Sequence, residues 1–200
     1  GRTRIHRDSI AAGEFPIDSF PTRKRERGHT VALEGYILML DKFTQPYQVP
    51  YRVIVPKAVD GLLVPVAASA THVAFSTIRM EPTWMALGQA AGTAAHLAIM
   101  SNQELRRLDT NRLQRLLLNE GAVLTFFKDI DRSHSAYAAL QYFGAKGFFP
   151  DYWARADEPL RRDTAARWLN MRIEGDGELT RSEAAELLKK KGITAPWTPS

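Results

Sequence analysis

Four polar side chains, Arg52, Thr71, His72 and Arg79, are the candidates for chemistry in this sequence. The His72 imidazole could give or take a proton beside a substrate, because an unperturbed histidine titrates near neutrality. It could equally hydrogen-bond a loop carbonyl and hold the shape of a turn. Arg52 could orient an anionic or polyol substrate, or form a salt bridge at the edge of a strand. The sequence leaves both alternatives open for both residues.

Metal-ligand patterns are weak in the chain. The sequence has no cysteine, and its five histidines show no paired ligand spacing. The segment 172–183 fits an EF-hand register at Gly177 and Glu183, but Arg172 stands where the first carboxylate ligand is needed. We therefore predict no metal site, and interpret the Asp-Gly pair as a turn before a helix with Thr180 near its N-cap.

A helix is predicted over 82–100, after a Pro-Thr turn, in the sequence RMEPTWMALGQAAGTAAHLA. Pro82 suits the first helical position, where its missing N–H costs nothing. The free N–H groups of the first turn, around Pro82 to Met85, then point outward at the positive end of the helix dipole. Such an end favours an anion or an electron-rich ligand edge. Arg79 stands just before it and could reinforce the same field.

One stripe of this predicted helix consists mainly of small residues. At i, i+3, i+4, i+7 and i+11 spacing it holds Gly88, Ala91, Gly92, Ala95 and Ile99. Each glycine costs about 1 kcal/mol relative to alanine in a helix interior, so a packing reason is expected. The stripe suits close approach of either another protein backbone or a flat ligand.

The elements that must position these residues begin with short strands. Strand-like stretches at 13–20, 31–40 and 49–57 are interrupted by prolines, which predicts short or edge strands. Residues 61–66, GLLVPV, have the composition of a buried strand. We therefore expect a strand, a turn and then the long helix.

The second half of the chain is predicted to be helical. A helix is expected over 110–118, and from residue 126 onward short amphipathic helices alternate with Gly, Pro and Asp. The predicted units are the end of a β-rich domain at 1–60, part of a second domain at 61–124 and a small helical module at 125–200.

Composition and charge exclude some classes of protein. Hydrophobic residues make up 44% of the 200 residues, enough for a buried core, and no stretch approaches the roughly 18 apolar residues of a membrane span. The net charge of +5 raises the question of nucleic acid. The densest basic run, 23–27, lies between Pro21 and Gly28, which is typical of a solvated loop. We therefore predict neither a nucleic-acid partner nor a membrane span.

Three motifs lie within 47–98, namely VPYRVIVPKAVDGLLV, SATHVA and RMEPTWMALGQAAGTAA. Together they closely resemble the C-terminal part of FAD-dependent oxidoreductases, in the branch labelled xanthan lyase-like, where the pattern is IPYR-LVPK-vdNLLV, SATH-A and R-MPT-MA-GQAAGTAA. Weaker similarity extends over 1–46 and 108–124.

The resemblance implies that the chain is the C-terminal fragment of a two-domain α/β flavoprotein, with FAD as cofactor and an unknown small or carbohydrate-like substrate. The first turn of the 82–100 helix would face the flavin pyrimidine edge, and the turn at 66–68 would pass near the ribityl phosphate. Because flavin supplies the hydride chemistry, the protein needs only to position the reactants and to provide the electrostatic field around them. His72 and Arg52 are the catalytic candidates. The residues placed around the cofactor are Val66, Ala67, Thr71, Arg79, Glu81, Pro82, Thr83, Trp84 and Met85.

Two features depart from the family pattern. Many members have Ala-Gly-Arg where this chain has Pro65-Val66-Ala67, so any contact from that arginine side chain is lost. In addition, no strand followed by G-x-G-x-x-G, the turn that cradles the FAD pyrophosphate, occurs in 1–200. We therefore expect FAD to be held only together with an N-terminal half, which would be a partner of this fragment.

The tail suggests a second class of function. Residues 126–169 resemble an S-layer homology repeat, and a fuller LTRSEAA occurs at 179–185. One helical face is predicted from Ala136, Ala139, Leu140 and Phe143. The tail is interpreted chiefly as a packing module. Under the alternative function, the chain is a non-catalytic module whose helical tail docks a cell-surface polymer or a partner protein.

Overall fold

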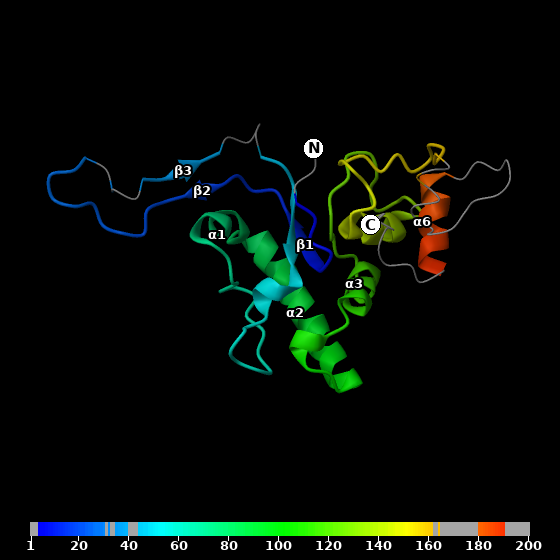
Figure 1. Cartoon of the computed structure of the whole chain (residues 1–200), viewed down its shortest axis with the longest axis horizontal. Coiled ribbons are helices and arrows are strands. Elements are labelled where there is room, and N and C mark those ends of the chain that lie inside the picture. Colours follow the sequence, from blue (N-terminus) through cyan, green and yellow to red (C-terminus); the bar gives the residue numbers. More distant parts are fainter. Residues whose placement is uncertain are drawn as a thin grey trace, which may run out of the picture.

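The computed structural model describes residues 4–30, 32, 35–39, 44–161, 164 and 180–190. Within these ranges the chain is mixed α/β, as predicted, with two small antiparallel sheets and five α-helices (Figure 1). The interpretation of 172–179 as part of a turn lies outside the described residues.

The first sheet lies in the core. Strand β1 (Ser9–Gly13) pairs with β4 (Tyr47–Pro50), and the register joins Gly13 to Tyr47 and Ser9 to Pro50. Ile10, Ala11 and Val49 are fully or almost fully buried between this sheet and the helices. The sheet therefore supplies the apolar floor on which the longest helix packs.

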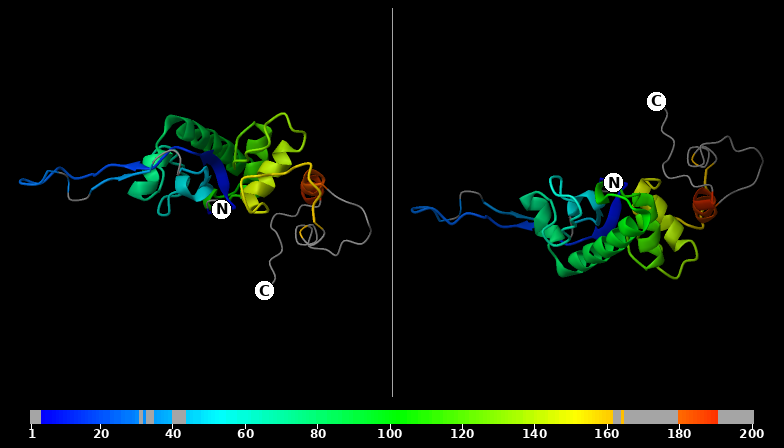
Figure 2. Two further views of the ribbon diagram at one scale, coloured as in Figure 1. Left: turned by 90° about the horizontal axis from the view of Figure 1, so that it is seen from above. Right: turned by 90° about the horizontal axis from the view of Figure 1, so that it is seen from below.

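The second sheet forms the base of a projecting arm. Strand β2 (Asp18–Ser19) pairs with β3 (Ile37–Leu38), and the arm extends away from the body in all three views (Figures 1 and 2). The basic run 23–27 belongs to this arm and is exposed, as predicted. Among the described residues of the strand-like stretches predicted at 13–20 and 31–40, Gly13, Asp18–Ser19 and Ile37–Leu38 take part in strand pairing.

Helix α2 (Glu81–Ser101) confirms the long predicted helix, extended by one residue at each end. Its buried face is formed by Thr83, Leu87, Ala90, Ala94, Leu97 and Ala98, which recur at helical spacing. Alanines on this face let α2 pack close to β1 and to α3 (Thr110–Asn119). The helix ends at Asn102, whose φ of 49° is a left-handed conformation that asparagine tolerates.

Two strand predictions are wrong. Residues Tyr51–Ile54 form a short 3-10 helix, η2, instead of continuing β4. Residues 61–66 are exposed or half-buried and form no strand. The N–H of Val64 donates to the Ile54 carbonyl at 2.8 Å, and Pro65 has no N–H with which to continue a ladder. The segment is apolar enough for a strand but has no neighbouring strand among the described residues.

Helix α1 (His72–Ile78) was not predicted, because its small and polar residues resemble a turn. Thr71 is its N-cap, and the Thr71 Oγ1 accepts a hydrogen bond of 3.2 Å from the N–H of Ala74. Two residues, Arg79 and Met80, separate the end of α1 at Ile78 from the start of α2 at Glu81.

The remaining helices are α3, preceded by the 3-10 turn η3 (Leu105–Arg107), then α4 (Tyr137–Lys146) and α6 (Arg181–Lys190). The predicted helical face of α4 is confirmed, because its four members are all buried. Thr180 caps α6, as predicted: the N–H of Glu183 donates to Thr180 Oγ1 at 3.2 Å, and the N–H of Thr180 donates to the Glu183 carboxylate at 2.8 Å.

Buried residues form two clusters, one from Ile10 to Leu124 with Ala145, and one from Phe127 to Leu188. Leu118 packs against both clusters, so the two are joined. The division of the chain at 60 and 124 stays a prediction.

Candidate functional site

The first turn of α2 is open to solvent on one side. Glu81, Pro82 and Met85 are exposed, whereas Thr83 and Trp84 turn inward. Met80 is the N-cap and provides no side-chain hydrogen bond, and Pro82 is the second helical residue, one place later than predicted. The backbone N–H groups at this end are therefore not capped by a side chain, and the positive end of the helix dipole is accessible.

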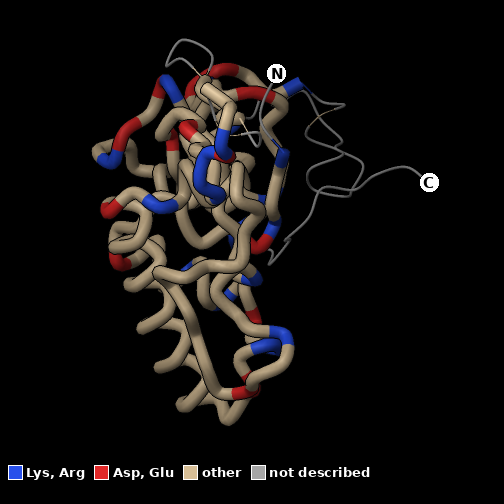
Figure 3. The backbone as a smooth tube through the Cα atoms, turned by 90° about the vertical axis from the view of Figure 1, so that its left-hand side faces the viewer, with Lys and Arg blue, Asp and Glu red and all other residues tan. Residues whose placement is uncertain are grey.

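The small-residue stripe of α2 continues along the exposed side. An added Cβ at Gly88 or Gly92 would meet nothing within 4 Å, and the side chains of Met85 and Ile99 are 75% and 79% exposed. Among the described residues, no backbone or side chain packs closely on either glycine. Glu81 is the single Asp, Glu, Lys or Arg residue of α2, so the helix is drawn almost entirely in tan in the lower part of Figure 3. Gly88, Gly92 and Ile99 of the stripe are thus exposed, whereas Ala91 and Ala95 are half-buried.

Arg79 lies at the junction of the two helices but is paired. Its Nη2 donates to both carboxylate oxygens of Asp18, at 2.8 and 2.9 Å. Asp18 belongs to β2, so the ion pair ties the base of the arm to the end of α1. This pairing reduces the field that Arg79 was expected to add at the start of α2.

His72 and Thr71 both contact backbone. The Nε2 of His72 lies 2.5 Å from the Phe20 carbonyl, which matches the structural alternative considered for this residue. Because a carbonyl only accepts, Nε2 carries the proton of this contact. Thr71 uses its hydroxyl as the helix cap. Neither contact tests a catalytic or cofactor role, and those roles stay predictions.

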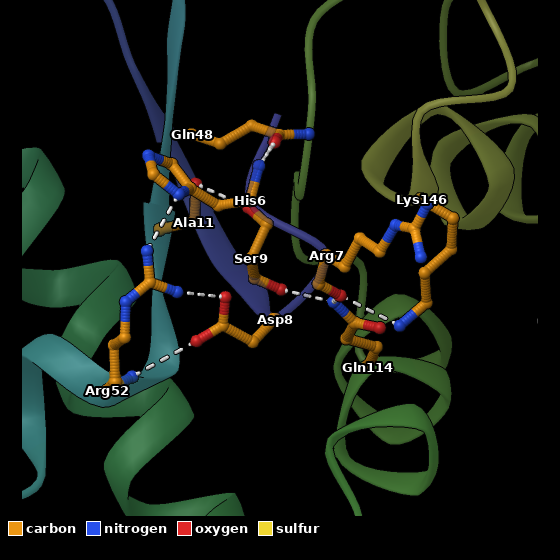
Figure 4. Close-up of polar contacts among 9 residues, drawn as sticks. All are labelled: His6, Arg7, Asp8, Ser9, Ala11, Gln48, Arg52, Gln114 and Lys146. Atoms are coloured by element: carbon orange, nitrogen blue, oxygen red, sulfur yellow. Dashed lines mark hydrogen bonds and ion pairs between the residues drawn. The ribbon is translucent and has the colours of Figure 1, made fainter. Parts of the chain in front are cut away.

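Arg52 lies at the edge of the first sheet, where η2 begins, and its side chain is 59% exposed (Figure 4). The Nη1 of Arg52 lies 2.5 Å from Asp8 Oδ1, and its Nη2 lies 2.9 Å from His6 Nδ1. The salt bridge matches the structural alternative for Arg52. Burial, and next the neighbouring Arg52 guanidinium, lower the pKa of His6.

The turn at His6–Ser9 was missed from sequence, yet its residues contact Gln48, Arg52, Gln114 and Lys146, which lie on four different elements (Figure 4). The N–H of His6 donates to Gln48 Oε1 at 2.7 Å, and Ser9 Oγ donates to the Leu124 carbonyl at 2.7 Å. The Nε2 of Gln114 donates to the carbonyls of Arg7 and Ser9. No spacing in the sequence indicates these pairs, because they are separated by 42 to 115 residues.

A cavity of about 590 Å³ lies between α1, β4 and the base of the arm. Arg52 lines it, as do Ser69 and Ala70, which follow the predicted ribityl turn. His72, Arg79 and the first turn of α2 do not line it. The structure therefore separates the candidate residues into a cavity wall and an exposed helix end.

Within the described residues, no group of three or more His, Cys, Asp or Glu side chains could hold a metal ion. No helix among the same residues is both long and apolar enough to cross a membrane.

Comparison with known families adds the decisive observation. The model of the FAD dependent oxidoreductase family matches residues 2–117, more than half of the chain. The chain belongs to the FAD dependent oxidoreductase family. No curated protein and no solved structure matches it.

The flavin placement at the start of α2 stays a prediction, and three features of this family member are compatible with it. The helix end is uncapped by side chains and exposed, which suits an electron-rich ring edge. The indole N–H of Trp84, in the same first turn, is buried and has no hydrogen-bond partner among the described residues. The smooth surface at Gly88 and Gly92 leaves room for close approach along the helix.

Proposed function

We propose that this chain supplies the flavin-facing and substrate-facing parts of an FAD-dependent oxidoreductase. The observation that carries the proposal is the start of α2, where Glu81, Pro82 and Met85 are exposed and the N-cap residue Met80 makes no side-chain hydrogen bond. In the proposed complex this end faces the pyrimidine edge of the flavin, with Pro82, Thr83, Trp84 and Met85 around it. The exposed residues Val66, Ala67 and Thr71 lie toward the ribityl phosphate, with Arg79 at the helix junction.

Bound FAD would supply hydride transfer, and reduction would increase the negative charge on its pyrimidine edge. The dipole of α2 stabilises negative charge at its N-terminal end. Arg52 is proposed to orient the substrate, and His72 to exchange a proton with it once its hydrogen bond to Phe20 is released. The narrower assignment to the xanthan lyase-like branch rests on the motifs within 47–98 and is part of the same proposal.

The proposal requires a second segment that cradles the pyrophosphate, since G-x-G-x-x-G does not occur in these 200 residues. The smooth stripe of α2 supports close packing by that segment, because both glycines face open space. The remaining alternative is a docking module built from 125–200. No contact of the described helices favours a polymer or a partner protein there.

Complementation tests the proposed function. The chain alone is expected to purify colourless, whereas co-expression with the segment of the same protein that carries G-x-G-x-x-G should give visible flavin absorbance at a 1:1 ratio. Gly88→Leu should fold normally but reduce flavin incorporation, because its side chain would occupy the stripe. A stoichiometric flavin on the isolated chain would contradict the need for a second segment. No flavin on the complemented pair would contradict the proposed function.

A further inference from the structure

The cavity beside Arg52 has the size of a small-molecule site. Its volume of about 590 Å³ lies within the roughly 300–1,000 Å³ of typical ligand pockets. Much of its wall is apolar and comes from the arm base, from η2 and from α1, through Phe15, Ile17, Met39, Val53, Ala74 and Ile78. An aliphatic or aromatic body would be desolvated against this wall.

The polar part of the wall is rich in donors. Arg4, His6 and Arg52 line the cavity, and no Asp or Glu does so among the described lining residues. Arg52 can only donate, so the His6 Nδ1 that contacts it accepts, and the neutral His6 ring carries its proton on Nε2. That nitrogen points away from Arg52 in Figure 4.

The carboxylate of Asp8 balances only part of the positive charge that Arg52 and Arg4 bring to the cavity wall. Asp8 accepts one hydrogen bond from the Arg52 side chain, and the guanidinium has further N–H groups to offer. Arg4 adds a second permanent cation on the same wall. A ligand group that accepts from several donors and carries negative charge fits here, and a carboxylate does both.

Two polar groups on the opposite wall, the hydroxyls of Thr77 and Tyr47, are already engaged. The hydroxyl of Thr77 contacts the Tyr47 hydroxyl at 2.7 Å and donates to the Phe15 carbonyl. Both residues line the cavity, yet their hydroxyls are used to hold α1 against β4. Gln48 also lines the cavity, and its buried Nε2 has no hydrogen-bond partner among the described residues. It is a further donor, which suits a carboxylate acceptor.

We propose that this cavity binds a small amphipathic carboxylic acid, its carboxylate held by Arg52, Arg4 and His6 and its apolar body lying against α1 and the arm base. As a ligand site it stands on the cavity itself. As the substrate site, it rests on the flavoenzyme function proposed above.

Binding of defined probes to the chain 1–200 tests the site without flavin. Isothermal titration would compare 3-phenylpropionate with 3-phenylpropanol, its neutral analogue, and with glucose. The acid should bind, and binding should weaken as salt is added. The alcohol should bind at least tenfold more weakly and glucose not measurably. Equal binding of acid and alcohol, preferential binding of glucose, or no binding of the acid would overturn the proposal.

Two variants locate the bound acid, and one serves as a control. Arg52→Gln removes the positive charge, and Ala74→Leu fills the apolar part of the cavity from α1. Each substitution should weaken the binding of 3-phenylpropionate at least tenfold. Arg107→Ala, an exposed arginine paired with Glu104 outside the cavity, should leave binding unchanged. Thermal unfolding checks each fold, and if Arg52→Gln fails to fold, Ala74→Leu decides. Unchanged binding in a folded Arg52→Gln or Ala74→Leu variant overturns the proposal.

The two proposals fail independently. Loss of acid binding with normal flavin incorporation in the complemented pair would overturn only the carboxylate site. Acid binding by a protein that never incorporates flavin would overturn only the oxidoreductase function.

Discussion

Lys146 is the buried cation that fastens α4 to the turn at His6–Ser9. Its Nζ donates to the Arg7 carbonyl at 2.8 Å, and it lies 5.1 Å from the centre of the Tyr142 ring (Figure 4 shows the hydrogen bond). Burial lowers the pKa of Lys146 to about 8 from 10.5, against the opposing effect of Asp109. One charged side chain thus links the two core clusters at a desolvation cost.

The pH dependence of stability follows from this pKa. Between about pH 8 and 10.5 the unfolded chain binds the lysine proton more than the folded chain does, so the free energy of unfolding rises with pH across this window. Lys146→Met removes the titration. We expect the stability difference, wild type minus Lys146→Met, to increase from pH 8 to pH 10 in urea unfolding. Tyrosine titrations largely cancel because both proteins contain them, and a constant difference would contradict the assigned pKa.

Thr180 and Glu183 cap α6 with reciprocal hydrogen bonds. Thr180→Ala should lower the free energy of unfolding by about 1 kcal/mol, because an N–H of the first turn loses its acceptor. Chemical denaturation measures the change. Glu186→Ala is the matched control on the same helix, since Glu186 pairs with Lys189 at 3.8 Å near the surface and should change stability by less than about 0.5 kcal/mol. Equal losses in both variants would argue against the cap.

At the scale of elements, the buried face and the exposed face of α2 differ sharply. The inner face packs on β1 and α3, whereas the outer face carries two glycines with no described neighbour. In α4 the opposite holds: a Cβ at Gly144 would lie 2.6 Å from Phe127 Cζ and 2.8 Å from Thr125 Cγ2. Glycine therefore lies on an open surface in α2 and in a tight packing contact in α4.

Alanine substitution distinguishes these glycines. Gly88→Ala should stabilise the chain by about 1 kcal/mol, because alanine is the better helix former and meets no atom. Gly144→Ala should destabilise it by roughly 1–3 kcal/mol, since Phe127 and Thr125 must move. Thermal or urea unfolding measures both. Destabilisation by Gly88→Ala would show that its outer face is packed after all.

Sequence predicted the elements whose signals are local. The Pro-Thr start of α2 and the run of residues after it gave its bounds to within one residue, and the cap at Thr180 was predicted from the residues around it. Helix α1 was missed because small polar residues also favour turns. The strand at 61–66 was wrong because a buried strand needs a neighbour, which composition does not reveal. The cavity lining combines residues far apart in the chain, so local patterns could not assemble it.

At the scale of the whole molecule, two exposed apolar surfaces stand out. One is the outer face of α2, and the other is the arm, where Phe20 stacks on Tyr36 and where Ile37 and Leu38 are more than half exposed. Exposed apolar surface of this kind marks interaction sites. Both surfaces belong to the part matched by the family, residues 2–117.

The flavin midpoint potential of the complemented protein tests the central claim most directly. Glu81 is exposed at the first position of α2, and Glu104 follows the other end of the helix. If the start of α2 faces the flavin, Glu81→Gln removes a negative charge that opposes reduction. The potential should then rise by on the order of 20–40 mV, where roughly 30 mV corresponds to about 1.4 kcal/mol for two electrons. Glu104→Gln should leave it unchanged. An unchanged or lowered potential in Glu81→Gln would contradict the placement of the flavin at this helix end.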